Sequence, residues 1–199
     1  MGTAIVSTSE LKTQIGITHT QDDSYLGTLV TLGTNQVEEW IGRDIKAANY
    51  TEYYSGDGTR ILKLRQGPLV SITRIDVVSY SSTGAETVDR VDTGSFFAMG
   101  LESDGWLLPG RIEYNQSHWI SGQRNYKVQY RAGFTATNGV PGGLKQAVLD
   151  TCVWHWNQRK SIGDQGIEPA VQVARYRPPR EFAEMLMGQY LWPYVDHSP

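Results

Sequence analysis

The sequence predicts an α+β protein in which a helical module carries an inserted small antiparallel β-barrel or sandwich. Apolar residues recur at helical spacing near the N-terminus and again after Val140. In the middle of the chain their spacing changes to two, and glycines interrupt the pattern at short intervals. We therefore expect residues 1–48 and 140–199 to form the helical module, which includes a C-terminal arm, and residues 50–134 to form the inserted β region.

Two helices are expected in the N-terminal quarter. The first begins at Ser7, because Ser7 and Glu10 have capping-box spacing, and it ends near Gly16. The second covers residues 21–42, where seven positions share one face. These positions are Leu26, Leu29, Val30, Gly33, Val37, Trp40 and Ile41. Gly27 and Gly33 weaken this helix unless another backbone comes close to them.

The β region begins with a short strand at residues 51–55. Alternating or β-branched runs predict further strands at residues 61–65, 70–78 and 126–131. Between residues 87 and 123 the apolar runs are short and separated by glycines, which indicates several short strands. The sequence Ser-Gly-Asp-Gly at residues 55–58 is typical of a turn, since it lacks the lysine of a phosphate loop and the spaced acids of a calcium loop.

A helix over residues 144–160 is expected to be the element around which the chain is organised. One face carries Leu144, Ala147, Val148, Thr151, Cys152 and His155. A second apolar stripe of Leu149, Val153 and Trp156 suggests neighbours on both sides, and Gly163 is expected to end the helix. We expect this helix to pack against the 21–42 helix, and Trp40→Ala to cost about 3–5 kcal/mol if the Trp40 ring is buried there.

Composition restricts the class of protein. The chain has 199 residues and a net charge of −3, which argues against a whole-protein role in gripping nucleic acid but permits a surface that DNA passes. No apolar run approaches the ~18 residues of a membrane span, and we expect no secretory signal. The single cysteine, Cys152, excludes an internal disulfide and fits a reducing compartment such as the host cytoplasm. We expect its thiol to be buried and unreactive.

The sequence predicts no catalytic, cofactor-binding or metal site. Cys152 and His155 lie three residues apart on one helix, but a lone cysteine on an apolar stripe is usually a small buried hydrophobe. Two alternatives place function in the β region: a carbohydrate- or surface-binding module, and a small hydrolase that uses a pair of carboxylates. The carboxylates available to such a hydrolase are Asp89, Asp92, Glu102, Asp104 and Glu113.

The C-terminal segment carries the candidate partner-binding residues, because aromatic side chains beside arginines are typical of interface hot spots. These residues are Arg175, Tyr176, Arg177, Arg180, Tyr190, Trp192 and Tyr194. Pro178 and Pro179 favour an extended chain between the arginines and a short amphipathic helix. We expect residues 171–199 to be an assembly arm that is ordered by a neighbouring protein; the alternative is that the helix folds back on its own domain.

Several segments together, in this order, resemble the head–tail connector (adaptor) proteins of long-tailed bacteriophages. They are SELKTQIGI, QDD, LVTLGTNQVEEWIGRDI, the EYYSGDGTRILKL and GPLVSITRI strands, and YKVQYRAGF followed by VPGGLKQAVLDTCVWHW. The resemblance covers roughly residues 9–43, 52–78 and 126–160.

This resemblance implies a structural protein without enzymatic activity, cofactor or membrane, located in the neck of the virion. It further implies a homo-oligomeric ring, a dodecamer, below the portal protein and above a stopper or tail protein. Double-stranded DNA is expected to pass through the lumen without specific binding. Twelve copies at −3 each carry about −36. Because DNA is also negative, this charge favours passage of the duplex over tight binding.

Overall fold

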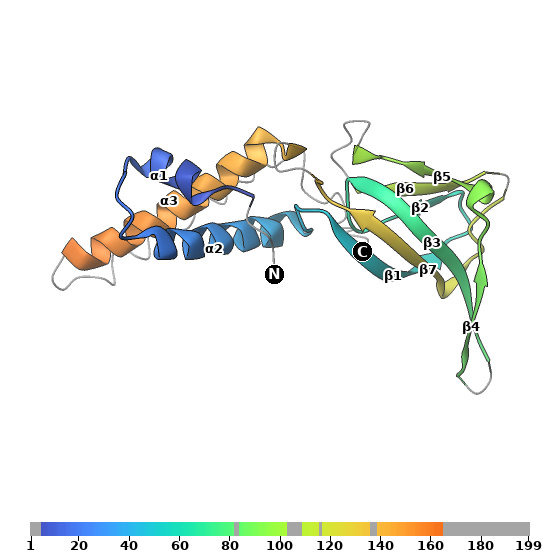
Figure 1. The fold of residues 1–199 in the computed structure, drawn as a ribbon. Coiled ribbons are helices and arrows are strands. Elements are labelled where there is room, and N and C mark those ends of the chain that lie inside the picture. Colours follow the sequence, from blue (N-terminus) through green and yellow to red (C-terminus); the bar gives the residue numbers. More distant parts are fainter. Residues whose placement is uncertain (1–4, 82–83, 103–108, 116, 136–138, 165–199) are drawn as a thin grey trace, which may run out of the picture. The chain divides into compact units, whose positions relative to one another are not determined.

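The computed structural model describes residues 5–81, 84–102, 109–115, 117–135 and 139–164, and within these it describes side chains up to residue 158 and in the last six residues the backbone alone. The chain divides into two compact units. The helical unit comprises residues 1–45 and 136–199, and the β unit comprises residues 46–135. Figure 1 shows the elements of both units in sequence colours. Among the described residues, no helix is both long and apolar enough to span a bilayer.

The first helix of the helical unit, α1 (Thr8–Ile15), is capped at both ends as predicted. The Ser7 Oγ accepts a hydrogen bond from the Glu10 backbone N–H, and the Glu10 carboxylate accepts one from the Ser7 backbone N–H at 2.6 Å. These bonds from Ser7 lower the pKa of Glu10, because they favour the charged carboxylate. Gly16 ends the helix with φ of 74°, which glycine adopts at no steric cost.

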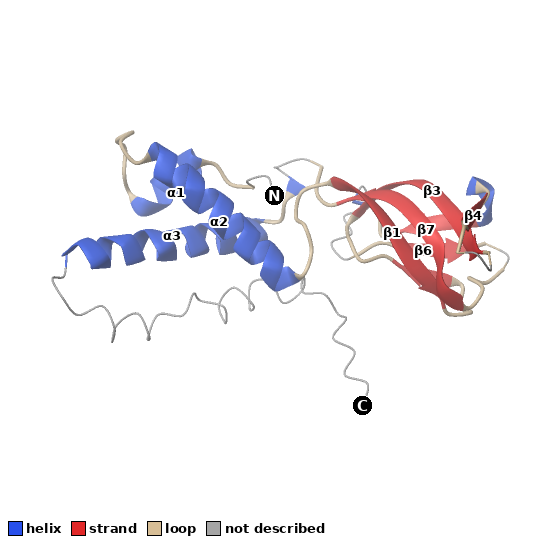
Figure 2. Ribbon diagram, turned by 90° about the horizontal axis from the view of Figure 1, so that it is seen from below, coloured by secondary structure: helices blue, strands red, loops and turns tan. Residues whose placement is uncertain are grey.

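The two long helices, α2 (Asp23–Ile41) and α3 (Gly142–Asp164), pack together as predicted, and α1 contacts both (Figure 2). A Cβ at Gly33 would lie 2.7 Å from the Cys152 Sγ and 3.2 Å from the Val148 carbonyl oxygen. Gly33 therefore permits the close approach of the two helices. A Cβ at Gly27 would meet only a methyl group of Thr8 at 4.0 Å, so no backbone approaches there.

The buried face of α2 differs from the predicted face at one important position. Trp40 is only half-buried, whereas Thr34 and Glu38 are buried. The Thr34 hydroxyl donates to the Val30 carbonyl at 2.8 Å, and the Glu38 carboxylate accepts from the Ile45 N–H at 3.0 Å. Both polar groups are thus satisfied inside the unit, and Trp40, which the sequence pattern placed on the apolar face, is only partly buried.

The helix α3 is longer than predicted. Gly163 does not end it, because the helix continues to Asp164. The face from Leu144 to Cys152 is buried, and the Cys152 thiol donates to the Leu29 carbonyl at 3.3 Å, which confirms a buried thiol. The second apolar stripe of Leu149, Val153 and Trp156 is only half-buried, so the described residues do not cover this helix on both sides as we had expected.

The β unit consists of two antiparallel sheets. The larger sheet has the order β1 (Ala48–Gly56), β7 (Gly122–Ala132), β3 (Leu69–Tyr80) and β4 (Glu86–Arg90). The smaller sheet has the order β2 (Ile61–Lys63), β6 (Arg111–Tyr114) and β5 (Phe96–Met99). A short 3-10 helix, η1 (Thr93–Ser95), precedes β5. The two sheets form a sandwich and do not close into a barrel, which decides between the two predicted architectures.

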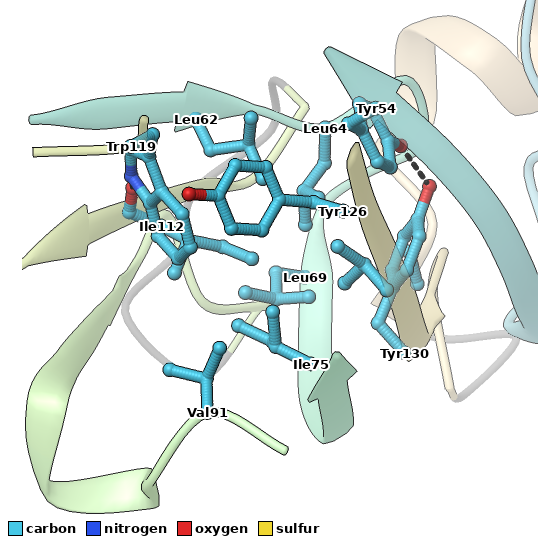
Figure 3. Close-up of a cluster of buried hydrophobic side chains, with 12 residues drawn as sticks. Tyr54, Leu62, Leu64, Leu69, Ile75, Val91, Ile112, Trp119, Tyr126 and Tyr130 are labelled. Carbon is cyan, nitrogen blue, oxygen red and sulfur yellow. Dashed lines mark hydrogen bonds between the residues drawn. The ribbon is translucent and has the colours of Figure 1, made fainter. Parts of the chain in front are cut away.

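The core of the β unit lies between the two sheets, with Trp119 at one side of the cluster (Figure 3). Trp119 is fully buried, and its Nε1 donates to the carbonyls of Arg60 at 3.0 Å and Ile112 at 3.2 Å. Its ring meets the rings of Tyr114 and Tyr126 edge-on. The other side chains of the core come from both sheets and their loops; they are Tyr54, Leu62, Leu64, Leu69, Ile75, Val91, Ile112, Tyr126, Val128, Tyr130 and Ala132.

Candidate partner-binding surfaces

The partner-binding residues predicted from the sequence lie outside the described residues. They are Arg175, Tyr176, Arg177, Arg180, Tyr190, Trp192 and Tyr194. Among the described residues, large apolar side chains are exposed at Leu32 of α2, at Ile120, and in two groups on the sheets of the β unit. The sequence pattern did not single out any of them.

The first surface is the edge strand β5, which exposes apolar side chains. Phe97 and Met99 are two residues apart and therefore lie on the same face of the smaller sheet, and both are exposed. Their cross-strand partners on β6 are Glu113 and Arg111. Large apolar side chains on an open strand edge are typical of surfaces that another protein covers.

The second surface is the hairpin of β3 and β4, which extends beyond the rest of its sheet in Figure 1. Every residue of β4 is exposed. Tyr80 and Val88 lie on the same face of this hairpin, and both are exposed, whereas the Val78 side chain opposite Val88 is buried. The β unit therefore presents two different apolar surfaces, one on each sheet.

A satisfied polar cluster fixes β1 to its neighbours. The phenol oxygens of Tyr54 and Tyr130 lie 3.1 Å apart, and both phenols donate to the Glu52 carboxylate. The backbone N–H groups of Arg65 and Gln66 donate to the same phenol oxygens. Burial raises the pKa of both tyrosines, so the phenols stay neutral donors. The cluster holds the strand β1 and the segment after β2 together and leaves no free nucleophile there.

A groove of about 540 Å³ borders this cluster, and Glu52 and Tyr54 belong to both. It is lined by the five consecutive residues Thr51 to Ser55 and by Arg65 and Arg124. Because adjacent residues of a strand point to opposite faces, a groove lined by all five runs along the free edge of β1. The lining is mostly polar, and the guanidinium groups of Arg65 and Arg124 lie 5.4 and 5.1 Å from the ring centroids of Tyr54 and Tyr53.

The carboxylates of the hydrolase alternative have separate local roles. Asp92 accepts from the Gly94 N–H at 3.1 Å, Glu102 accepts from the Thr135 N–H at 2.8 Å, and Glu113 lies 3.7 Å from Arg60. Asp89 belongs to the exposed strand β4, and Asp104 lies outside the described residues. These contacts are those of turn, cap and surface charges and do not favour the hydrolase alternative.

The alternative of a metal site at Cys152 and His155 is not favoured either. His155 contacts the Gln36 side chain at 3.1 Å, and burial lowers its pKa. Burial raises the pKa of Cys152 to about 12, which keeps the thiol protonated. In the part of the chain that the structure describes, no three metal-ligating side chains come together.

The carboxylates of the hydrolase alternative lie in local structural contacts, and the β unit exposes apolar side chains on both of its sheets, which is typical of surfaces that another protein covers. A family model for head completion proteins matches residues 4–168, and the chain belongs to this family. The match confirms the predicted resemblance, and the chain is a structural head–tail connector of the virion. No curated protein matches the sequence significantly.

Three solved structures share the fold over almost the whole chain. A chain in the neck of an empty gene transfer agent (GTA) particle, computed with C6 symmetry, aligns with a TM-score of 0.63 at 15% identity, covering 98% of this chain and 93% of that chain. A chain in the virion of a native GTA particle aligns with a TM-score of 0.62 at 14% identity and the same coverage. A chain in the neck of a native GTA particle, computed with C12 symmetry, aligns with a TM-score of 0.61 at 15% identity, covering 96% and 91%. At these identities the likeness shows the fold.

Proposed function

We propose that the chain forms a closed homo-oligomeric ring in the neck, a dodecamer, which joins the portal protein to a stopper or tail protein. The observation that carries the proposal is the family match over residues 4–168. The fold neighbours support it, because they are chains of GTA particles whose necks were computed with C6 and C12 symmetry. The ring continues the DNA channel, and the chain has no catalytic role.

The two apolar surfaces of the β unit support a ring. A closed cyclic ring needs a head-to-tail contact, in which two different surfaces of the same chain meet. The β5 surface with Phe97 and Met99 and the hairpin surface with Tyr80 and Val88 are different surfaces on separate sheets. Each is therefore available to a separate neighbour, either another copy of the chain or a portal or tail protein.

The two units serve different parts of this role. The helical module of residues 1–48 and 140–199 supplies the rigid α2–α3 pair, and its segment beyond residue 170 acts as the arm that binds the portal or the next copy. The inserted region of residues 50–134 supplies the exposed sheet surfaces. An arm ordered by its neighbour is stabilised only when that neighbour is present, so assembly and arm folding are coupled.

The test is to measure the mass of the complex that the purified chain forms with and without the portal protein, by native mass spectrometry. The expected result is a portal complex that carries twelve copies of the chain. A variant in which Phe97 and Met99 are both changed to Ser should remain folded and lose either ring formation or binding to the portal complex, because it removes one of the two contact surfaces. A chain that stays monomeric in the presence of the portal would contradict the proposal.

A further inference from the structure

The outer face of the four-stranded sheet carries five of the ten lysine and arginine side chains of the β unit. On β7 the side chains of Tyr126, Val128 and Tyr130 belong to the core, so Lys127 and Arg131 point to the opposite, outer face. The pairing register places Asp76 of β3 opposite Lys127. Strand pairing places side chains of β3 and β4 on the same outer face.

Further charged side chains of β3 and β4 lie on this face. Arg90 of β4 pairs with Asp76, and its neighbour Val91 points into the core, so Arg90 points outward. Arg74 is bonded to Asp76 and shares its face. Together with Arg124, the outer face carries five basic side chains and two carboxylates, hence a net charge of +3 on a chain of net −3. The charged residues are Arg74, Arg90, Arg124, Lys127, Arg131, Asp76 and Glu86.

Both carboxylates are neutralised within the sheet. The Arg74 Nε lies 2.6 Å from the Asp76 Oδ1, and Asp76 is only 2% exposed. The Lys127 Nζ lies 3.5 Å from the Glu86 Oε1, and the Tyr53 hydroxyl also donates to Glu86 at 3.3 Å. The hydrogen bond with Tyr53, followed by the charge of Glu86, raises the pKa of Lys127.

Three guanidinium groups of this face remain open to solvent. Arg90, Arg124 and Arg131 are exposed, and none of them forms an ion pair with a described carboxylate. Lys127 and Arg131 are four residues apart on one strand, about 13 Å, and β4 lies two strands away from β7, about 10 Å. The positive charge is therefore spread across the sheet and is not focused on one point.

The backbone at Arg124 is held in an unusual conformation that places its guanidinium on this face. Its φ is 50°, which is uncommon outside glycine. The pairing register of β1 and β7 shifts between Tyr54 and Gly56, and Arg124 lies opposite this shift. The Arg124 backbone N–H donates to the Ser55 Oγ at 3.0 Å. The guanidinium then lies 5.1 Å from the centroid of the Tyr53 ring. Bulges of this kind redirect a side chain, and strained residues cluster at functional sites.

We propose that this outer face, defined by Arg90, Arg124, Arg131 and their sheet neighbours, contacts the phosphates of double-stranded DNA. An acidic protein surface would also suit a positive face, but interfaces between proteins have an apolar centre. The exposed apolar side chains of this face, Tyr80 and Val88, lie toward the turn of the hairpin and away from Arg131. Protein–DNA interfaces are more polar and more positive than protein–protein interfaces, which matches this face.

The contact is sequence-independent and weak, as a duplex that slides through a neck requires. Guanidinium contacts to phosphates carry no base information, and the affinity depends on the counterions released. The inference rests on the proposed function only for the presence of DNA beside the chain. The DNA contact and the ring can therefore be measured and fail separately.

The test measures binding of a fluorescein-labelled duplex of mixed sequence to the purified full chain by fluorescence anisotropy across a salt series. The parent is expected to bind with a Kd on the order of micromolar, weakening steeply with salt. The variant Arg90→Ala/Arg131→Ala should lower the slope of log affinity against log salt by about 2 and weaken binding several-fold, since each phosphate contact contributes about 0.9. Arg124→Gly, which suits the positive φ, should lower the slope by about 1.

The matched control is Arg60→Ala/Lys63→Ala, which removes two exposed positive charges at β2 of the smaller sheet. It should keep the slope and affinity of the parent, and circular dichroism should show the fold of every variant to be intact. The proposal is overturned if the two double variants lose the same amount of affinity for the duplex. It is also overturned if DNA binding by the parent does not depend on salt. An Arg90→Ala/Arg131→Ala variant that binds DNA normally yet fails to join the portal complex would overturn it as well, because that result assigns the face to an acidic protein. A parent that forms no ring but shows the expected slopes would refute the proposed function alone.

Discussion

Gly33→Ala is the substitution that tests the α2–α3 contact most sharply. A methyl group at this position would lie 2.7 Å from the Cys152 Sγ, 3.2 Å from the Val148 carbonyl oxygen and 3.7 Å from the Cys152 backbone nitrogen. Two of these three atoms belong to the backbone of α3 and cannot rotate away. The helices must therefore separate locally to accept the methyl group.

The expected magnitude follows from two opposing effects. Replacing glycine by alanine inside a helix favours folding by about 1 kcal/mol through helix propensity. Overpacking a well-packed contact costs about 1–3 kcal/mol. The cost here lies toward the upper part of that range, because the Cys152 sulfur and the Val148 carbonyl oxygen are both close to the added methyl group. We expect Gly33→Ala to lower the free energy of unfolding of the helical unit by about 1 kcal/mol.

Gly27→Ala is the matched control on the same helix. Its methyl group would meet only the Thr8 methyl at 4.0 Å, so helix propensity acts unopposed and stability should rise by up to about 1 kcal/mol. Urea unfolding followed by far-UV circular dichroism measures both changes, with the helical signal reporting on this unit. If Gly33→Ala is as stable as Gly27→Ala, the close approach of the two helices is wrong.

A double variant separates the sulfur from the backbone in this contact. Cys152→Ala alone should destabilise the unit, because it removes a fully buried side chain. In Gly33→Ala/Cys152→Ala the added methyl group takes space that the sulfur leaves, so the two changes should couple favourably by about 1 kcal/mol. Strict additivity would show that the two side chains do not share the contact.

Three further outcomes are expected. Trp119→Ala should cost about 3–5 kcal/mol in urea unfolding of the β unit, since it leaves a cavity in the core and removes the indole hydrogen bonds to the Arg60 and Ile112 carbonyls; a cost below about 1 kcal/mol would remove Trp119 from the core. Cys152 should react slowly with a thiol reagent under native conditions and rapidly in urea. Because burial raises its pKa to about 12, its contribution to stability is complete below the ordinary thiol pKa and is lost as pH rises toward 12, and rapid native labelling at neutral pH would contradict this. Truncation after Ala170 should leave a folded chain with an almost unchanged melting temperature that no longer joins portal-containing particles, whereas unfolding or aggregation of the truncated chain would place the tail in the core.

Local sequence patterns predicted the elements well where a single mechanism determined them. The capping box of Ser7 and Glu10 and the left-handed Gly16 were confirmed because both depend on neighbouring residues alone. The packing of α2 on α3 was predictable from two apolar stripes and a glycine, and Gly33 indeed lies at the contact.

The sequence pattern did not predict which polar residues of α2 are buried with hydrogen-bond partners. Thr34 and Glu38 are buried, whereas Trp40 is only partly buried. The two polar side chains can be buried because their hydrogen-bond partners, Val30 and Ile45, belong to the same unit. Periodicity assigns polar residues to the surface and cannot detect such partners. Gly163 was expected to end α3, but a glycine inside a helix costs only about 1 kcal/mol and can be tolerated.

The basic face of the β unit was not predictable for a different reason. Its charges come from strands far apart in the sequence, and only the pairing register brings Arg90, Arg131 and Lys127 to one side of the sheet. Composition reported a net charge of −3 and gave no hint of a local excess of positive charge. The alternation on β7 was the one local pattern that pointed to it, since Lys127 and Arg131 interleave with core residues.

The central claim is that copies of this chain close into a ring at the junction of head and tail. The most direct measurement is end-on imaging, by negative-stain electron microscopy, of the purified portal complex formed with the chain. We expect a closed ring of twelve copies around an open channel. Images in which the chain is absent from the complex, or bound without cyclic symmetry, would contradict it.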